Sequence, residues 1–228
     1  MSTLVIIPAY NEEESIVSTV QELIGKVPGV QYVVVNDGSL DSTAELCKMH
    51  NFNLIDLPVN LGLTGAFQTG MKYAYQHGFE RAIQFDADGQ HDPRFIPILE
   101  RRMQESNADI VIGSRFIGCK KPHSLRMLGS NLISTLIHAA TGTAINDPTS
   151  GMRLYNKSVI ELFSKRSDLT PEPETIAFLI KRRGMRVVEE QVTMRERTAG
   201  ESYLTPSKAV IYMANACSSI LFSLWFRR

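Results

Sequence analysis

Short runs of apolar, mostly β-branched residues recur along the chain and alternate with longer stretches of helical periodicity. A continuous run of this kind is typical of a strand that is buried on both faces of a parallel sheet. We expect one short strand after a turn at residues 147–153. The remaining strands are expected at residues 3–7, 31–36, 53–57, 81–85, 109–113 and 186–194.

Helices are predicted in the intervening stretches. The first has Asn11 as its expected N-cap, with acidic residues in its first turn. Its apolar stripe consists of Ile16, Val17, Val20, Leu23 and Ile24. Further helices are expected after Asp41 or Ser42, over 62–77, from about Pro93, over 124–141 and over 173–183. Strands that alternate with helices of this length predict an α/β fold with a mainly parallel sheet flanked by helices.

Polar loops follow four of the expected strands. Parallel sheets place their ligands at the carboxyl ends of the strands, so these loops are expected to converge on one binding edge. Each loop alone is an ordinary turn sequence, and Gly62-x-x-Gly65 is too weak to indicate a dinucleotide fingerprint. The four loops are Tyr10-Asn11-Glu12, Asp37-Gly38-Ser39, Asn60-Leu61-Gly62 and Asp86-Ala87-Asp88.

The most distinctive loop is 84–93, where an apolar strand ends in three carboxylates within seven residues. Asp86 and Asp88 are two positions apart and point the same way in extended geometry, and the turn at Gly89 can return Gln90 beside them. Such oxygen ligands suit Mg²⁺ or Mn²⁺ rather than structural zinc. His91 fits a turn-stabilising imidazole better than a ligand.

Composition excludes several classes of protein. The 24 basic and 24 acidic residues balance, so bulk charge does not indicate nucleic-acid binding. The last part of the chain is basic: residues 181–228 hold nine Lys/Arg against four Asp/Glu, which fits an anionic surface. Cys47, Cys119 and Cys217 form no Cys-x-x-Cys pair, and no secretory signal precedes the first strand, so a reducing cytoplasm is expected.

The C-terminal stretch 209–226 contains no charged residue and reaches the lower edge of transmembrane length. Polar residues interrupt it, which favours a peripheral membrane helix, and a helix packing a dimer is the equal alternative. We therefore predict one domain over 1–205 and a membrane-associating or dimer-packing helix over 206–228.

Taken in order, these motifs resemble the family 2 glycosyltransferases of the GT-A (Rossmann-like) fold. Within that family the resemblance is to the polyprenyl-phosphate, or dolichyl-phosphate mannose synthase-like, group. It covers nearly all of the chain. The motifs are Pro8-Ala9-Tyr10-Asn11-Glu12, Asn36-Asp37-Gly38-Ser39, Asn60-x-Gly62, Asp86 to Pro93, Gly113-Ser114-Arg115, Asp147-Pro148-Thr149-Ser150-Gly151 and Arg197-x-x-Gly200-x-Ser202.

The resemblance implies a donor site and a metal site. Asp88 and Gln90 would hold Mg²⁺ or Mn²⁺, and Asp86 would face either the metal or the ribose. Arg197 would clamp the diphosphate of the donor, a role that suits its planar fork of donors. The nucleotide sugar would be bound by Pro8, Ala9, Tyr10, Glu12, Asp37, Gly62, Asp86, Arg197 and Ser202.

The resemblance also implies a polyprenyl-phosphate acceptor, with basic residues at the positions of Arg115 and Arg126 and with Ser130 one turn further on. A phosphate nucleophile requires no general base, whereas a sugar hydroxyl does. Leu125, Leu128, Leu132 and Leu136 would form an apolar track for the isoprenoid. The alternative is that Arg115 pairs with a structural carboxylate and that the leucines are core. Asp147 is equally a turn residue or a pocket carboxylate, and it is the first candidate base for hydroxyl transfer.

The predicted function is a metal-dependent inverting glycosyltransferase that moves a sugar from a nucleotide sugar to polyprenyl phosphate at the inner face of the cell membrane. Transfer to a saccharide hydroxyl in cell-wall or capsule assembly shares every donor-site residue and stays open. A nucleotidyltransferase would show a Gly-rich phosphate loop after the first strand, which is absent, and intact acids argue against a non-catalytic binding module. No residue decides between UDP and GDP donors, and UDP is favoured.

Overall fold

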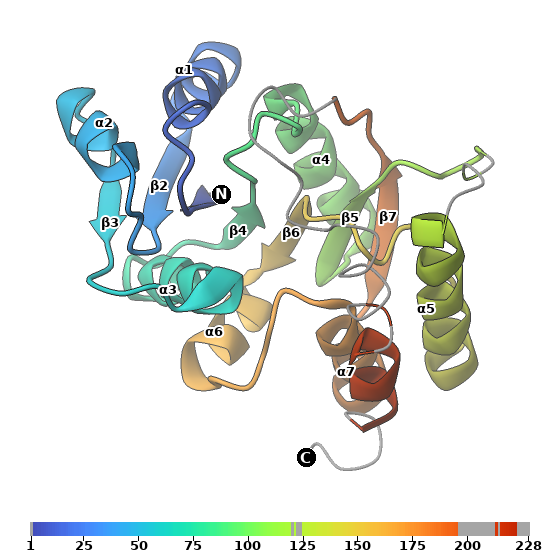
Figure 1. Ribbon diagram of the computed structural model, residues 1–228. Helices are drawn as coiled ribbons and strands as arrows, with labels where there is room; N and C mark the ends of the chain where they lie inside the picture. The colour runs from blue at the N-terminus through green and yellow to red at the C-terminus, as the bar shows by residue number, and fades with distance from the viewer. Residues whose placement is uncertain (1, 120, 122–124, 196–212, 214, 223–228) are drawn as a thin grey trace.

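A computed structural model of the protein describes residues 2–119, 121, 125–195, 213 and 215–222. Within these residues, seven strands form one sheet in the order β3-β2-β1-β4-β6-β5-β7 (Figure 1). β6 is antiparallel to both of its neighbours, and all other pairs are parallel. The strands are β1 (Thr3–Ala9), β2 (Gln31–Asn36), β3 (Leu54–Asp56), β4 (Arg81–Gln84), β5 (Ile110–Ser114), β6 (Arg153–Asn156) and β7 (Val187–Gln191).

Helices cover both faces of the sheet, so the fold has three layers (Figure 1). Strand side chains alternate between the two faces. In β1, Leu4 and Ile6 pack toward α3, α5, α6 and α7, whereas Val5 and Ile7 pack toward α1, α2 and α4. The helices are α1 (Ile16–Lys26), α2 (Thr43–Met49), α3 (Gly62–Gln76), the 3₁₀ turn η1 (Pro93–Phe95), α4 (Ile96–Ser106), α5 (Leu125–Thr141), α6 (Lys157–Lys165) and α7 (Pro173–Arg183).

The direction of β6 determines which loops meet. The parallel strands end at one edge of the sheet, and β6 begins at that edge because it runs the opposite way. The turn that precedes β6, residues 147–151, therefore lies beside the loops that follow β4 and β5. The predicted mainly parallel sheet and the predicted convergence of polar loops at one edge are both confirmed.

Several local predictions need correction. Asn11 does not cap α1: it adopts a left-handed conformation with φ 54°, and the helix begins only at Ile16, with no acidic residue in its first turn. Ile24, placed on the apolar stripe, is 44% exposed. The last strand is shorter than predicted, and α6 (Lys157–Lys165) was not predicted at all, although Val159, Ile160 and Phe163 give it a buried face.

The C-terminal helix lies partly outside the described residues. Met213 and residues 215–222 are helical, and Ala216 and Ile220 belong to the buried core on the α5–α7 face. Leu221 and Phe222 are exposed. In the part of the chain that the structure describes, no helix has the length and apolarity that membrane crossing requires. The division at residue 205 and the membrane or dimer role of this helix stay predictions.

Candidate active site

The loops after β1 and β2 are bound to each other by side chain–backbone hydrogen bonds. Asn11 N–H donates to Ser39 Oγ (2.9 Å), and Asn11 Oδ1 accepts from Leu40 N–H (2.9 Å). Glu12 N–H donates to Thr43 Oγ1 (2.8 Å). The left-handed conformation of Asn11 therefore has a local cause, because the residue makes both contacts across the two loops. Pro8 and Ala9 form the end of β1, and Tyr10 follows with 42% of its surface exposed.

Asp37 connects this pair of loops to the loop after β3. Its side chain is buried, and Oδ1 accepts from Leu61 N–H (2.8 Å). Gly38 has φ 66°, and a Cβ there would lie 2.7 Å from the carbonyl carbon of Val59, so only glycine fits. The next loop turns at Gly62, where Asn60 Oδ1 accepts the Gly62 N–H (2.9 Å). The predicted donor-binding residues of the three loops therefore lie along one rim, in which hydrogen bonds join neighbouring loops.

The loop after β4 holds the predicted metal ligands. Asp86 Oδ1 accepts from Gln84 Nε2 (3.2 Å), and buried Asp88 accepts from Gln90 N–H through Oδ1 (3.0 Å). His91 is buried, and its Nδ1 accepts from Asp86 N–H (3.0 Å), so the Nε2 proton faces Asp86 Oδ2 at 3.5 Å. His91 thus stabilises the turn, as the favoured interpretation predicted.

The oxygen atoms of this loop fit a hard divalent cation. Asp86, Asp88 and Gln90 supply carboxylate and amide oxygens, which Mg²⁺ and Mn²⁺ prefer. Gln84 Oε1, next to Asp86, is a buried acceptor without a hydrogen-bond partner among the described residues. Among the described residues, no three His, Cys, Asp or Glu side chains are placed so that together they could hold a metal ion, so a cation here would complete its shell with Gln90, water or phosphate oxygens.

The turn before β6 supports the Asp86 side chain. A Cβ on Gly151 would lie 2.5 Å from Asp86 Oδ2, so the carboxylate rests directly on this glycine. Arg153, which is fully buried, holds this turn in place. Its guanidinium donates to the carbonyls of Pro148, Ser150 and Pro171. Arg153 is a structural residue that the sequence indicated only as part of a short strand.

Asp147, in the same turn, is already paired. It has no exposed surface, and it accepts from Arg115 Nε (2.7 Å), Arg115 Nη2 (2.8 Å) and Arg115 N–H (3.1 Å). Glu189, from β7, accepts the backbone N–H groups of Asn146 and Asp147. Arg115 therefore pairs with a buried carboxylate, as the alternative interpretation predicted. Its guanidinium binds Asp147 through Nε and Nη2, and Nη1 does not take part in that pairing.

A second cation, which sequence reasoning missed, lies beside Arg115. Lys121 Nζ donates to buried Ser130 Oγ at 3.2 Å. Both cations lie over the ring of Phe116, with the Arg115 guanidinium carbon at 5.1 Å and Lys121 Nζ at 5.4 Å from its centroid. Burial lowers the pKa of Lys121. The Lys120-Lys121 pair was the available signal, and it indicated only a break between elements.

The predicted apolar track on α5 is described only in part, because the Leu125 side chain lies outside the description, and the other leucines differ in exposure. Ile133 and Ile137 provide the buried face of the helix, whereas Leu128 and Leu132 are 64% and 52% exposed. Leu136 is partly buried against the core. The alternative that these leucines are core therefore fails for Leu128 and Leu132.

Three predicted site residues are not placed. Arg197 and Ser202 lie outside the described residues. Arg126 belongs to α5, but its side chain is not described. The roles predicted for these three residues stay predictions.

The family follows from sequence comparison. The model of the family described as "Glycosyl transferase family 2" matches residues 4–163, which include the loops after β1, β2, β3 and β4. The chain belongs to glycosyltransferase family 2. It is therefore a glycosyltransferase, and the predicted family and enzyme class are confirmed.

Two curated relatives cover most of this glycosyltransferase. An undecaprenyl-phosphate mannosyltransferase from Micrococcus luteus is 31% identical over 90% of the chain and 88% of its own length. A UDP-N-acetylglucosamine–dolichyl-phosphate N-acetylglucosaminyltransferase from Methanococcus voltae is 31% identical over 71% of the chain and 72% of its own length. Both names describe sugar transfer to a polyprenyl-type phosphate.

Among solved structures, glucosyl-3-phosphoglycerate synthase from Mycobacterium tuberculosis, in complex with Mn²⁺, UDP and phosphoglyceric acid, superimposes with a TM-score of 0.71. The match covers 98% of this chain and 78% of that one at 18% identity. At this identity the likeness concerns the fold, and it confirms the predicted GT-A architecture.

Proposed function

We propose that this glycosyltransferase moves a sugar from a nucleotide sugar, with a UDP-sugar favoured, to a polyprenyl phosphate. The observation that carries the proposal is the separation of charge along one edge of the sheet. Asp86 and Asp88 lie on the loop after β4, and Arg115 and Lys121 lie beyond the turn before β6. The carboxylates could hold a metal ion that binds one phosphorylated substrate, and the two basic side chains could bind the phosphate of a second. This arrangement suits a reaction between two phosphorylated substrates. The names of both curated relatives support the same acceptor class.

The donor would occupy the rim formed by the loops after β1, β2 and β3. Asp37 would bind the base or ribose, because its second carboxylate oxygen can accept from an imide or hydroxyl group. A UDP donor is supported by the name of the Methanococcus voltae relative and by the UDP in the Mycobacterium tuberculosis structure. GDP-sugars are the competing donors.

Mg²⁺ or Mn²⁺ would be held by Asp88 and Gln90, with Asp86 facing the cation or the ribose. A cation held there would supply positive charge to stabilise the nucleoside diphosphate as it departs. The Mn²⁺ in the similar fold supports this assignment. The chain's own contribution is to hold the ligand oxygens in place through Gln84, His91 and Gly151.

The arrangement around Asp147 favours a phosphate acceptor. A hydroxyl acceptor needs a base that can take its proton, yet the Asp147 carboxylate accepts three hydrogen bonds from Arg115 and is fully buried. A phosphate monoester, whose second pKa is about 6, is already a nucleophile at neutral pH and needs only cations to position it. Lys121 would supply such a cation, together with Arg115 and Arg126, and the Ser130 hydroxyl would add a hydrogen bond.

The isoprenoid chain would leave this phosphate site along α5, where Leu128 and Leu132 are exposed. Leu221 and Phe222 expose further apolar surface on the C-terminal helix. Together with the basic C-terminal region, these residues support peripheral attachment to the inner face of the cell membrane. Flotation of the full chain with anionic liposomes tests this attachment, and a chain that stays unbound and dimeric would favour the dimer-packing alternative.

Sugar transfer to matched acceptors tests the function. Radiolabelled nucleotide sugar is incubated with undecaprenyl phosphate, undecaprenol or a free oligosaccharide, and label in the organic phase and released nucleoside diphosphate are measured. We expect label to enter the lipid only with the phosphorylated acceptor. Equal transfer to undecaprenol or to the oligosaccharide would overturn the proposal and favour hydroxyl transfer.

A thermal-shift panel of UDP- and GDP-sugars with Mn²⁺ identifies the donor. A ligand at 100 times its dissociation constant stabilises the folded protein by about 2.7 kcal/mol, which is readily resolved. We expect the larger shift from a UDP-sugar. A shift with GDP-sugars alone would correct the base and leave the acceptor proposal intact.

A further inference from the structure

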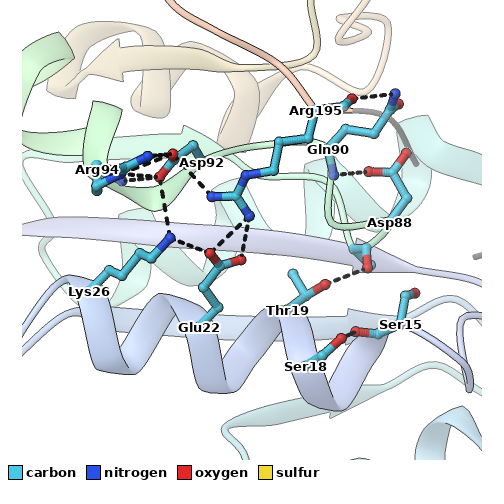
Figure 2. Close-up of polar contacts among 11 residues, drawn as sticks. Ser15, Ser18, Thr19, Glu22, Lys26, Asp88, Gln90, Asp92, Arg94 and Arg195 are labelled. Carbon is cyan, nitrogen blue, oxygen red and sulfur yellow. Dashed lines mark hydrogen bonds and ion pairs between the residues drawn. The ribbon is translucent and has the colours of Figure 1, made fainter. Parts of the chain in front are cut away.

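The polar face of α1 lies beneath the loop after β4 (Figure 2). Thr19, Glu22 and Lys26 occupy positions i, i+3 and i+7 of the helix, so they share one face. Thr19 Oγ1 donates to the carbonyl of Ala87 (2.9 Å), which lies between the two predicted metal-binding carboxylates. Lys26 pairs with Glu22 and lies 4.0 Å from Asp92 Oδ1. The helix therefore contacts both ends of the loop from Ala87 to Asp92.

Arg195, which follows β7, joins this face to the loop. Its Nη1 donates to both carboxylate oxygens of Glu22 (2.8 Å each), and its Nη2 lies 3.0 Å from Asp92 Oδ2. The side chain of Asp92 is only 5% exposed, so this contact is largely shielded from water. A planar guanidinium can bind two carboxylates from different segments at once, which an ammonium cannot do with the same geometry.

The backbone of Arg195 pairs with the predicted metal ligand Gln90. Arg195 N–H donates to the Gln90 carbonyl (3.0 Å), and Gln90 Nε2 donates to the Arg195 carbonyl (3.3 Å). The second bond fixes which way the carboxamide faces: with its NH₂ group toward Arg195, its Oε1 is the atom that can ligate a cation. Gln90 N–H in turn donates to Asp88 Oδ1. Figure 2 shows this continuous series from Glu22 to Asp88.

We propose that Arg195 is a positioning residue for the metal site. Held by Glu22 and Asp92, it fixes the carboxamide of Gln90 and, through the same residue, the carboxylate of Asp88. Arg195 itself binds neither cation nor substrate. The inference rests on the proposed function, because it requires that Asp88 and Gln90 hold a divalent cation.

The test measures Mn²⁺ affinity by electron paramagnetic resonance of the free ion, with and without UDP, and thermal unfolding of the same samples. Arg195→Met should weaken Mn²⁺ binding about tenfold, equivalent to about 1.4 kcal/mol. Glu22→Gln keeps Arg195 and removes the charge of one of its two anchors, so we expect a smaller loss of about threefold. Arg94→Met is the matched control, because it also removes a guanidinium from Asp92. The Arg94 side chain is 70% exposed, and its pairing is with Asp92. Its Mn²⁺ affinity should stay within twofold of wild type.

Kinetics separate positioning from simple stability. In Arg195→Met, the metal concentration for half-maximal transfer should rise about tenfold, whereas the KM for polyprenyl phosphate stays within twofold. If Arg195→Met and Glu22→Gln lower the unfolding temperature but bind Mn²⁺ as wild type does, the proposal is overturned and Arg195 is only structural. If Asp88→Asn also binds Mn²⁺ normally, the metal assignment of the proposed function has failed as well, so the two failures are distinguishable.

Discussion

Two aspartate-bearing segments meet at the same edge of the sheet, and they differ in how their carboxylates are held. In the turn before β6, Asp147 is fully buried and is bound by the Arg115 guanidinium through two hydrogen bonds. In the loop after β4, Gln84 Nε2 donates to Asp86 and Gln90 N–H donates to Asp88. Asp147 therefore has its counter-charge, Arg115, within the fold. Asp86 and Asp88 supply carboxylate oxygens of the kind that Mg²⁺ and Mn²⁺ prefer as ligands.

This difference supports different roles for the two segments, and the roles of the site residues stay predictions. A buried carboxylate that lost its guanidinium would be an uncompensated charge, so Arg115 and Asp147 act as a structural unit. Asp88 belongs to a short loop that Thr19, Gly151 and Arg195 support from three directions. These contacts fix the position of the loop, as a metal-binding loop requires, because its ligand atoms must be held to within a fraction of an ångström.

The largest effect is expected from Asp88→Asn. Losing one carboxylate at a metal site should lower transfer about a thousandfold while the circular dichroism spectrum and unfolding temperature stay near wild type. Asp168→Asn, which alters a carboxylate paired with Arg166 on the surface, is the control and should retain activity. Near-wild-type turnover of Asp88→Asn at saturating Mn²⁺ would remove the distinction between the two segments.

Arg115→Met should lower stability, in addition to weakening the proposed acceptor-phosphate site. It leaves Asp147 buried without its partner, and we expect the free energy of unfolding to fall by about 3–5 kcal/mol in urea titrations. Arg166→Met breaks the exposed pair with Asp168, and its cost should stay below about 1 kcal/mol. A similar small cost for both variants would show that Asp147 does not depend on Arg115.

Gly151→Ala tests the contact between the two segments. The added methyl group would lie 2.5 Å from Asp86 Oδ2, so the carboxylate must move. We expect transfer to fall about tenfold and the free energy of unfolding to fall by about 1–2 kcal/mol. Gly25→Ala, in α1 with open space around it, should leave transfer unchanged. If the two variants behave alike, the position of Asp86 does not depend on Gly151.

The smallest effect concerns acid stability beneath the metal loop. The hydrogen bond from Arg195 lowers the pKa of Glu22, and those from Arg94 and then Arg195 lower the pKa of Asp92. Carboxyl groups with lowered folded-state pKa values stabilise the fold above their unfolded pKa of about 4, and this contribution is lost as pH falls through the folded values. Urea titrations between pH 3 and 7 should therefore show a steeper acid limb for wild type than for Arg195→Met. Parallel profiles would contradict the role of Arg195 in this network.

Much of the fold could be predicted because its signals are local. The apolar run at 31–36 matches β2 at both ends, and the motif-bearing loops lie at the predicted edge. The direction of β6 could not be predicted, because a strand of four residues is set by the neighbours β4 and β5. Asn11 was misassigned because acids after an Asn resemble a helix start, whereas the residue instead bonds across to Ser39 and Leu40.

The residues of the candidate metal site could be proposed from sequence for the same reason. Asp86, Asp88 and Gln90 lie within five positions of one another, so their type and spacing predict their chemistry. The pairs that position them are long-range: Arg195 and Glu22 are separated by 173 positions, and Arg115 and Asp147 by 32. Single-residue patterns carry no signal for such pairs, which is why Arg195 and Glu189 were missed.

Anomalous scattering from crystals soaked with Mn²⁺ and UDP would locate the metal directly. We expect one strong manganese peak about 2.2 Å from an Asp88 carboxylate oxygen, within ligand distance of Gln90 Oε1 and beside the UDP diphosphate. No manganese is expected at Asp147. A peak at Asp147, or bound UDP without manganese at Asp88, would contradict the assignment of Asp88 as the metal ligand.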